Sequence, residues 1–158
     1  MIDLVILDMY GTVVGRGNNA TPRNGFPQFM DRYQNKNIVL ATDDDLRHIV
    51  DRNLRDLGII DKLDKVYTYQ DMVEIKGYHG KRKDLKRICA DFRVSPNRAV
   101  FISDGEKDLE DAQRDKAKFV HVPYYEQLDE PFSFLLIDLS KRLPKYLDLR
   151  DVNLPSGR

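Results

Sequence analysis

The chain has 158 residues, which is the size of one domain and enough to bury a hydrophobic core. Its 26 Lys and Arg residues balance 26 Asp and Glu residues, so there is no charge excess that would favour nucleic acid or an anionic membrane as a partner. The single cysteine, Cys89, excludes an internal disulfide, and no apolar run reaches the ~18 residues of a membrane span. We therefore expect a cytoplasmic protein.

The first part of the chain predicts two strands separated by a loop and a helix. Residues 2–8 form an apolar run that ends on Asp8, and residues 11–27, rich in Gly, Asn and Pro, predict a loop or a small flap. A short helix is expected near residues 25–35, and a buried strand over 37–42.

The next helix is expected to begin directly after this second strand. Asp43, Asp44 and Asp45 suit helix caps and the positive end of a helix dipole. Gly58 marks the end of the helix. Its apolar stripe consists of Leu46, Ile49, Val50, Leu54 and Leu57.

The second half of the chain continues the alternation of strands and helices. The expected elements are a strand over 66–69, a polar connection through Gly77, His79 and Gly80, a helix with Leu85, Ile88, Cys89 and Phe92 on one face, a strand over 99–102, a helix over 109–114, a strand over 119–122, and a packing helix from about 131 with a polar tail to 158. This order predicts one α/β domain over 1–158, a doubly wound, mainly parallel sheet of about five strands with helices on both faces.

Asp8 is the first candidate functional residue, because it follows a buried strand directly. In open α/β sheets, ligands bind beside the carboxyl ends of the strands. A carboxylate at that edge is a candidate nucleophile or metal ligand. Thr42 and Asp104 also follow apolar strands, so we expect all three side chains at the same edge.

The run Asp8-Met9-Tyr10-Gly11-Thr12 resembles the first signature of the haloacid dehalogenase-like hydrolase superfamily, Asp-x-Asp-Gly-Thr. The later residues of that pattern follow in order, with Thr42, a Lys near 81, and an acidic pair. The pair is Asp104 and Asp108 in the run Ser103-Asp104-Gly105-Glu106-Lys107-Asp108, and the resemblance spans roughly residues 3 to 122.

The resemblance implies a small capless member of the superfamily, of Rossmann-like fold, that hydrolyses phosphoesters. Asp8 would attack phosphorus, Thr42 would hold a phosphate oxygen, and a lysine would neutralise charge. Gly11 and Thr12 would shape the turn beside the substrate. Mg²⁺ would be held by Asp8, the Tyr10 carbonyl, Asp104 and Asp108, since hard cations prefer oxygen ligands.

Two lysines compete for the charge-neutralising role. Lys81 lies four residues before Leu85, the spacing found in many relatives, and is our preferred candidate. Lys83-Asp84-Leu85 instead resembles the corresponding segment of capless phosphatases that act on protein tails, so Lys83 stays open as a substrate-binding alternative.

Tyr10 is the departure from the phosphatase pattern, because its position normally holds the aspartate that acts as general acid and base. A phenol with a pKa near 10 donates a hydrogen bond but is a poor base at neutral pH. Three readings follow: a phosphatase for a phosphorylated small molecule or a phosphoprotein, working alone or in a homo-oligomer; an impaired phosphatase-like binding or regulatory domain; or a dehalogenase of the Asp-x-Tyr-Gly-Thr type, which needs no metal.

Overall fold

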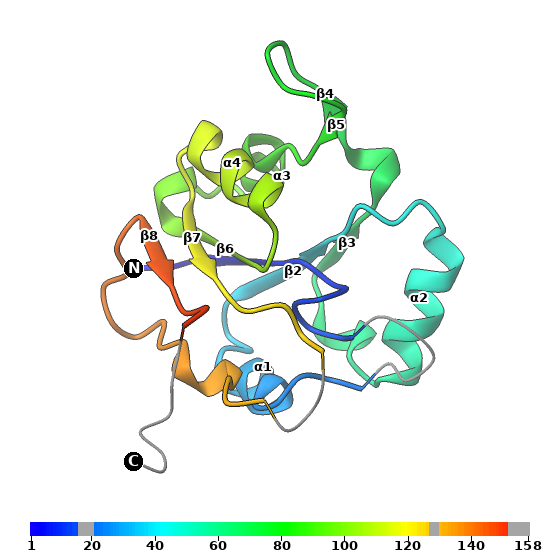
Figure 1. The fold of residues 1–158 in the computed structure, drawn as a ribbon, viewed down its shortest axis with the longest axis vertical. Coiled ribbons are helices and arrows are strands. Elements are labelled where there is room, and N and C mark those ends of the chain that lie inside the picture. The colour runs from blue at the N-terminus through cyan, green and yellow to red at the C-terminus, as the bar shows by residue number, and fades with distance from the viewer. Residues whose placement is uncertain (16–20, 127–129, 152–158) are drawn as a thin grey trace.

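The computed structural model describes residues 1–15, 21–126 and 130–151, and its centre is a parallel sheet (Figure 1). The sheet has the strand order β3-β2-β1-β6-β7-β8. Its strands are β1 (Leu4–Leu7), β2 (Asn37–Ala41), β3 (Lys65–Tyr67), β6 (Ala99–Ser103), β7 (Lys118–His121) and β8 (Tyr146–Asp148). Every pairing in it is parallel. From β1 the chain first adds strands on one side, β2 and β3, and later adds β6, β7 and β8 on the other side. In doubly wound folds, ligands bind at the point where the strand order changes in this way.

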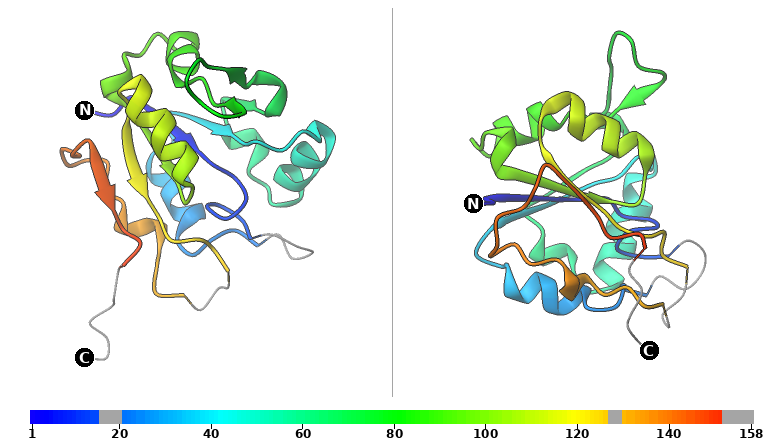
Figure 2. Two further views of the ribbon diagram at one scale, coloured as in Figure 1. Left: turned by 45° about the horizontal axis from the view of Figure 1, so that its top comes forward. Right: turned by 60° about the vertical axis from the view of Figure 1, so that its left-hand side comes forward.

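Helices cover both faces of the sheet, which confirms the predicted fold class (Figure 2). The helices are α1 (Phe26–Arg32), α2 (Arg47–Asp56), α3 (Leu85–Asp91) and α4 (Glu106–Asp115). The alternation of side chains along β1 divides the core between them, because successive residues of a strand face opposite sides. Val5 and Leu7 pack in the cluster that contains α1 and α2, whereas Leu4 and Ile6 pack in the cluster of α3 and α4.

A short antiparallel hairpin projects from the body of the molecule at the top of Figure 1. Its strands are β4 (Val73–Glu74) and β5 (Lys81–Arg82). The sequence predicted only a polar connection in this region. Single 3-10 turns complete the described fold: η1 (Ile60–Lys62), η2 (Tyr69–Asp71), η3 (Pro96–Arg98) and η4 (Phe134–Leu136).

The predicted packing helix after residue 131 was wrong within residues 130–151. The segment forms the 3-10 turn η4 and then β8, which becomes the sixth strand of the sheet. Phe134 is fully buried and its ring meets the ring of Phe26 at 5.0 Å, while Leu135 and Leu136 stay exposed. The apolar residues therefore anchor an irregular segment on α1, and their burial does not follow the spacing of a helix. The polar tail expected after Pro144 was wrong at residues 146–148, which form β8, and its end at 152–158 lies outside the described residues.

Two other boundaries differ from the sequence prediction. Helix α2 begins at Arg47 because the Asp44 carboxylate accepts a hydrogen bond from the Leu46 amide at 2.8 Å, a local turn that delays the helix. The predicted flap at 11–27 includes residues 16–20, which lie outside the described residues, and its end belongs to α1. Within the described part of the chain, no helix combines the length and apolar character needed to cross a membrane.

Candidate active site

The carboxyl ends of β1, β2 and β6 bring three predicted residues to one edge of the sheet. Asp8 follows β1, Thr42 follows β2, and Asp104 follows β6. The Asp8 amide donates to the Ile102 carbonyl at 3.1 Å, so the ladder between β1 and β6 continues to the first residue of the site. Asp8 is 9 % exposed, which leaves its carboxylate reachable while most of the residue is buried.

Lys83, not Lys81, is the lysine beside Asp8. The Lys83 ammonium lies 3.0 Å from Asp8 Oδ1 and 3.0 Å from Asp108 Oδ2, and it is almost completely buried. Lys81 belongs to the projecting hairpin, where its ammonium lies 5.4 Å from the centre of the Tyr69 ring. Our preference for Lys81 therefore fails on geometry, because Lys81 is only partly buried on the projecting hairpin, whereas Lys83 follows β5 and is buried.

Lys83 and the carboxylates around it change each other's pKa values. Burial disfavours the ammonium, but the carboxylates of Asp108 and Asp8 overcome it and raise the pKa of Lys83 above its ordinary value. Burial raises the pKa of Asp108 to about 7, against the opposing effect of Lys83. The site thus holds a permanent positive charge directly against the proposed nucleophile.

A second carboxylate approaches Asp8 through Thr12. The Thr12 hydroxyl lies 2.8 Å from Asp104 Oδ1 and 3.2 Å from Asp8 Oδ2, and it accepts a hydrogen bond from the Asp104 amide at 3.0 Å. A hydroxyl has one hydrogen, so it satisfies only one carboxylate at a time. Burial and the neighbouring Asp8 carboxylate raise the pKa of Asp104. A cation between the carboxylates of Asp8 and Asp104 would reduce their mutual repulsion.

Tyr10 and Gly11 shape the turn that follows β1. The Tyr10 hydroxyl accepts a hydrogen bond from Asn53 Nδ2 of α2 at 2.8 Å, and its ring packs against the core. Gly11 has a φ of +85°, and a Cβ there would lie 2.8 Å from the Tyr124 ring and 3.1 Å from Asp104 Oδ1. Only glycine fits this close turn.

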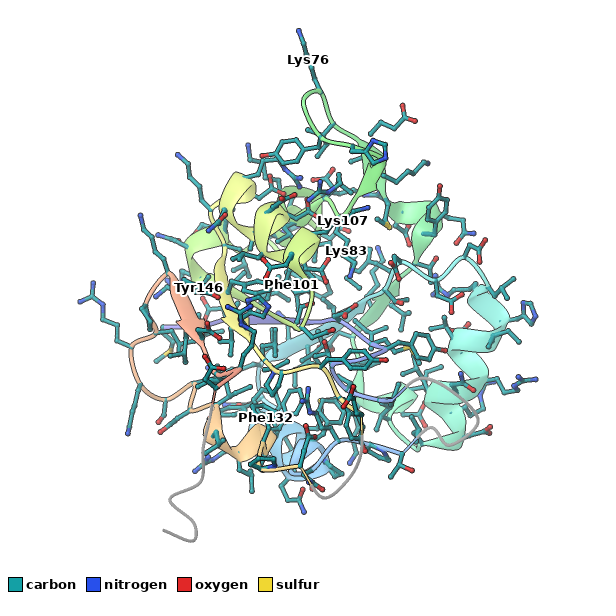
Figure 3. The ribbon with its side chains drawn as sticks, viewed as in Figure 1. Lys76, Lys83, Phe101, Lys107, Phe132 and Tyr146 are labelled. Carbon is teal, nitrogen blue, oxygen red and sulfur yellow. The ribbon has the colours of Figure 1, made fainter. Side chains whose placement is uncertain are left out.

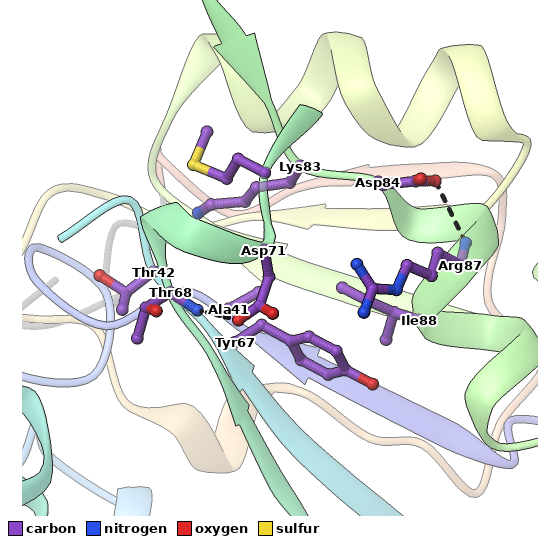
Figure 4. A pocket seen from close by; sticks show the side chains of 10 residues that line it. Ala41, Thr42, Tyr67, Thr68, Asp71, Lys83, Asp84, Arg87 and Ile88 are labelled. Atoms are coloured by element: carbon purple, nitrogen blue, oxygen red, sulfur yellow. Dashed lines mark hydrogen bonds between the residues drawn. The ribbon is translucent and has the colours of Figure 1, made fainter. Parts of the chain in front are cut away.

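Thr42 is buried and lines a small pocket together with Lys83 (Figure 4). Its hydroxyl accepts a hydrogen bond from the Asp44 amide at 3.3 Å. Figure 4 shows the Lys83 side chain extending above the end of β2, on the side of Thr42. The predicted phosphate-binding threonine and the lysine that contacts Asp8 thus border one space.

A row of acids on α4 fixes the segment carrying Lys83; sequence reasoning named Asp108 as a metal ligand and missed Asp111 and Asp115. Asp108 accepts a hydrogen bond from the Lys83 ammonium, Asp111 from the Lys83 amide at 3.1 Å, and Asp115 from the Leu85 amide at 2.9 Å. Their spacing of three and four residues places them on one face of a helix, and that spacing was the signal available in the sequence.

The buried Arg82, the partly buried Arg114 and Ser103 complete this network. Arg82 and Arg114 both bind Asp111, at 3.0 and 2.6 Å, and Arg114 also donates to the Lys83 carbonyl at 2.7 Å. Ser103 donates to Asp108 Oδ2 at 2.7 Å. The side chain and the backbone of Lys83 are therefore both held from α4.

Whether this site fits a metal depends on how its carboxylates are arranged. No group of three or more His, Cys, Asp or Glu side chains within residues 1–15, 21–126 and 130–151 is arranged as a metal cage. Mg²⁺ often binds through only one or two carboxylates, with waters and substrate phosphate completing its shell. Asp8 and Asp104 supply such a pair because the Thr12 hydroxyl reaches both of them, whereas Asp108, the other predicted ligand, is held by Lys83 and Ser103 through Oδ2.

Comparison with known proteins identifies the family. A family model described as haloacid dehalogenase-like hydrolase matches residues 16–114. The chain belongs to the haloacid dehalogenase-like hydrolases. The match begins after Thr12, so the site at the end of β1 is an observation independent of it. Among curated proteins, no sequence matches.

Solved structures of this fold share little sequence with the chain. An uncharacterised protein from Listeria monocytogenes serotype 4b has a TM-score of 0.67 and 16% identity, over 94% of this chain and 91% of that one. The L-2-haloacid dehalogenase from Xanthobacter autotrophicus has a TM-score of 0.63 and 12% identity, over 80% of each chain. The core domain of a protein named as a phosphoglycolate phosphatase from Streptococcus pneumoniae has a TM-score of 0.56 and 15% identity, over 77% and 80%.

These similarities establish the fold alone. The same haloacid dehalogenase-like fold carries a named dehalogenase and a named phosphatase, so the reaction has to be argued from the site.

Proposed function

We propose that this haloacid dehalogenase-like protein is a phosphomonoester hydrolase in which Asp8 is the nucleophile. The observation that carries the proposal is the position of Asp8 between the Lys83 ammonium at 3.0 Å and the hydroxyl of Thr12, which reaches Asp104. A phosphate dianion repels a carboxylate, so attack by Asp8 requires cationic groups at the same place.

The reaction would proceed in two displacements. In the first, an Asp8 carboxylate oxygen forms a bond to phosphorus, the bond from phosphorus to the ester oxygen breaks, and the leaving alkoxide takes up a proton from solvent water. In the second, water attacks the aspartyl phosphate and releases inorganic phosphate and the Asp8 carboxylate. Lys83 would offset charge on the transferring group, and Thr42, which borders the same space, would hold one of its oxygens.

Mg²⁺ fits the proposal through Asp8, Asp104 and the carbonyl of Tyr10, and when bound it would supply further positive charge to the phosphoryl oxygens. The raised pKa of Asp104 beside Asp8 supports this assignment, because two adjacent carboxylates are stabilised by a shared cation. The acidic Asp104 beside Asp8 suits a cation better than a metal-free halide site, which disfavours the dehalogenase reading.

Tyr10 limits the second displacement. Its hydroxyl oxygen already accepts a hydrogen bond from Asn53 of α2, and a phenol is a poor general base at neutral pH, so Tyr10 would activate the attacking water weakly. This observation favours a second candidate function, a domain that binds or retains a phosphoryl group and turns over slowly.

Hydrolysis of an aryl phosphate with Mg²⁺ tests the proposal in wild type, Asp8→Asn, Lys83→Gln and Tyr10→Asp. We expect wild-type turnover that Asp8→Asn abolishes and Lys83→Gln strongly reduces. A silent wild type with an active Tyr10→Asp would support the slow-turnover domain. Metal-independent chloride release from a haloacid would contradict both in favour of the dehalogenase.

A further inference from the structure

A groove of about 200 Å³ adjoins the reactive residues on the side of the projecting hairpin. It is lined by Asp43, Tyr69, Met72, Lys81, Arg82, Lys83, Lys107, Asp108 and Asp111. Lys83 and Asp108 are the groups that contact each other beside Asp8, so the groove is continuous with the proposed phosphoryl site.

The charges along the groove differ in whether they are already paired. Lys83 is neutralised by Asp8 and Asp108, and Arg82 is neutralised by Asp111 and Glu110. Lys81 and Lys107 have no carboxylate partner among the described residues. Among the carboxylates that line the groove, Asp43 is the one without a cationic partner in the described residues. The groove therefore has two unpaired ammonium groups and one unpaired carboxylate.

Lys81 and Lys107 belong to different elements that line the groove. Lys81 lies on β5 with its ammonium over the ring of Tyr69, and Lys107 lies in the first turn of α4. The Lys107 carbonyl accepts a hydrogen bond from Arg82 at 2.9 Å, which joins the start of α4 to β5. Figure 3 shows Lys107 and Lys83 on the same side of the molecule, with Lys76 far off at the tip of the hairpin.

We propose that this groove binds the leaving group of the substrate, and that the leaving group carries its own anionic substituent, a carboxylate or a second phosphate. Lys81 and Lys107 would bind that anion, and Tyr69 would contact the part of the leaving group between the two charges. The proposal rests on the phosphatase function and narrows its substrate class from any phosphomonoester to a doubly anionic one.

The test compares two ligands of nearly equal size, 4-carboxyphenyl phosphate and its carboxamide analogue. We expect a higher kcat/KM for the carboxylate, with Lys81→Gln and Lys107→Gln each lowering it about fivefold, the upper range for a partly exposed ion pair. The double variant should bring the carboxylate substrate close to the amide. Lys76→Gln, which removes the same charge from the hairpin tip, is the matched control and should preserve the preference.

Calorimetric binding of both compounds to Asp8→Asn separates this inference from the proposed function, because it requires no turnover. Tighter binding of the carboxylate, lost in the variants that also carry Lys81→Gln and Lys107→Gln, supports the groove even if the wild type is a poor catalyst. Equal affinities and equal kcat/KM values for the two compounds would overturn the groove while leaving phosphoester hydrolysis intact. Absence of binding by both compounds would overturn the groove as well.

Discussion

Replacing Asp111 tests whether the row of acids on α4 holds the Lys83 segment in place. Asp111 is 1 % exposed, and its carboxylate accepts hydrogen bonds from the Lys83 amide, Arg82 Nε and Arg114 Nη1. In Asp111→Ala these donors lose a buried acceptor, and breaking a buried ion pair from one side typically costs about 3 to 5 kcal/mol.

The structure places the expected loss at the lower end of that range. Arg82 keeps Glu110 at 2.7 Å and the Lys107 carbonyl, and Arg114 keeps Asp115 at 2.9 Å, so neither guanidinium is left without partners. We therefore expect Asp111→Ala to lower the free energy of unfolding by about 3 kcal/mol. Asp111→Asn should lose less, because its amide oxygen can still accept from the Lys83 amide.

Urea unfolding followed by circular dichroism measures this loss, with Glu110→Ala as the matched control. Glu110 is the neighbouring acid on α4 and binds the same Arg82, but its side chain is 56% exposed. An exposed ion pair contributes roughly 0 to 1 kcal/mol, so the control should stay within that range. Equal effects of Asp111→Ala and Glu110→Ala would refute the view that this buried row secures Lys83.

Three further predictions concern the turn after β1 and the buried thiol. Gly11→Ala should lower stability more than Gly58→Ala in thermal unfolding, because both have positive φ but only Gly11 has close neighbours; equal losses would count against the close turn. Tyr10→Phe should cost about 1 kcal/mol through the lost bond from Asn53 and leave kcat nearly unchanged, and a large fall in kcat would assign the hydroxyl a direct role. Burial raises the pKa of Cys89 to about 11, so the reactive thiolate forms only as the pH approaches that value and only about one thiol in 1,000 is ionised at pH 8. Alkylation of the folded protein should be slow at pH 8 and fast in urea, and equal rates would contradict this burial.

The sequence predicted the sheet well because its central strands are buried on both faces. Runs such as residues 99–102 are apolar without interruption, and such runs have few alternatives to a parallel strand. The end of the chain could not be predicted in this way. Its apolar residues near Phe134 pack individually on α1, and β8 is only three residues long, with mostly exposed side chains.

The site was predictable where a residue follows its strand directly. Asp8, Thr42 and Asp104 required only the strand ends, and the parallel sheet brings those ends together. The lysine was not predictable from spacing, because β5 and its hairpin decide which lysine enters the core. Lys81 and Lys83 are two residues apart, and the contacts of Lys83 with Asp8 and with α4 distinguish them.

The central claim is that Asp8 accepts a phosphoryl group, and mass spectrometry of the protein incubated with an aryl phosphate and Mg²⁺ tests it most directly. Transfer to Asp8 can be detected in two ways. Fast hydrolysis releases phosphate at a steady rate, whereas slow hydrolysis, caused by Tyr10, leaves a phosphoryl adduct on the peptide containing Asp8. We predict at least one of them in wild type, neither in Asp8→Asn, and a marked reduction in Lys83→Gln. Absence of both in wild type, or an adduct that persists in Asp8→Asn, would contradict the account.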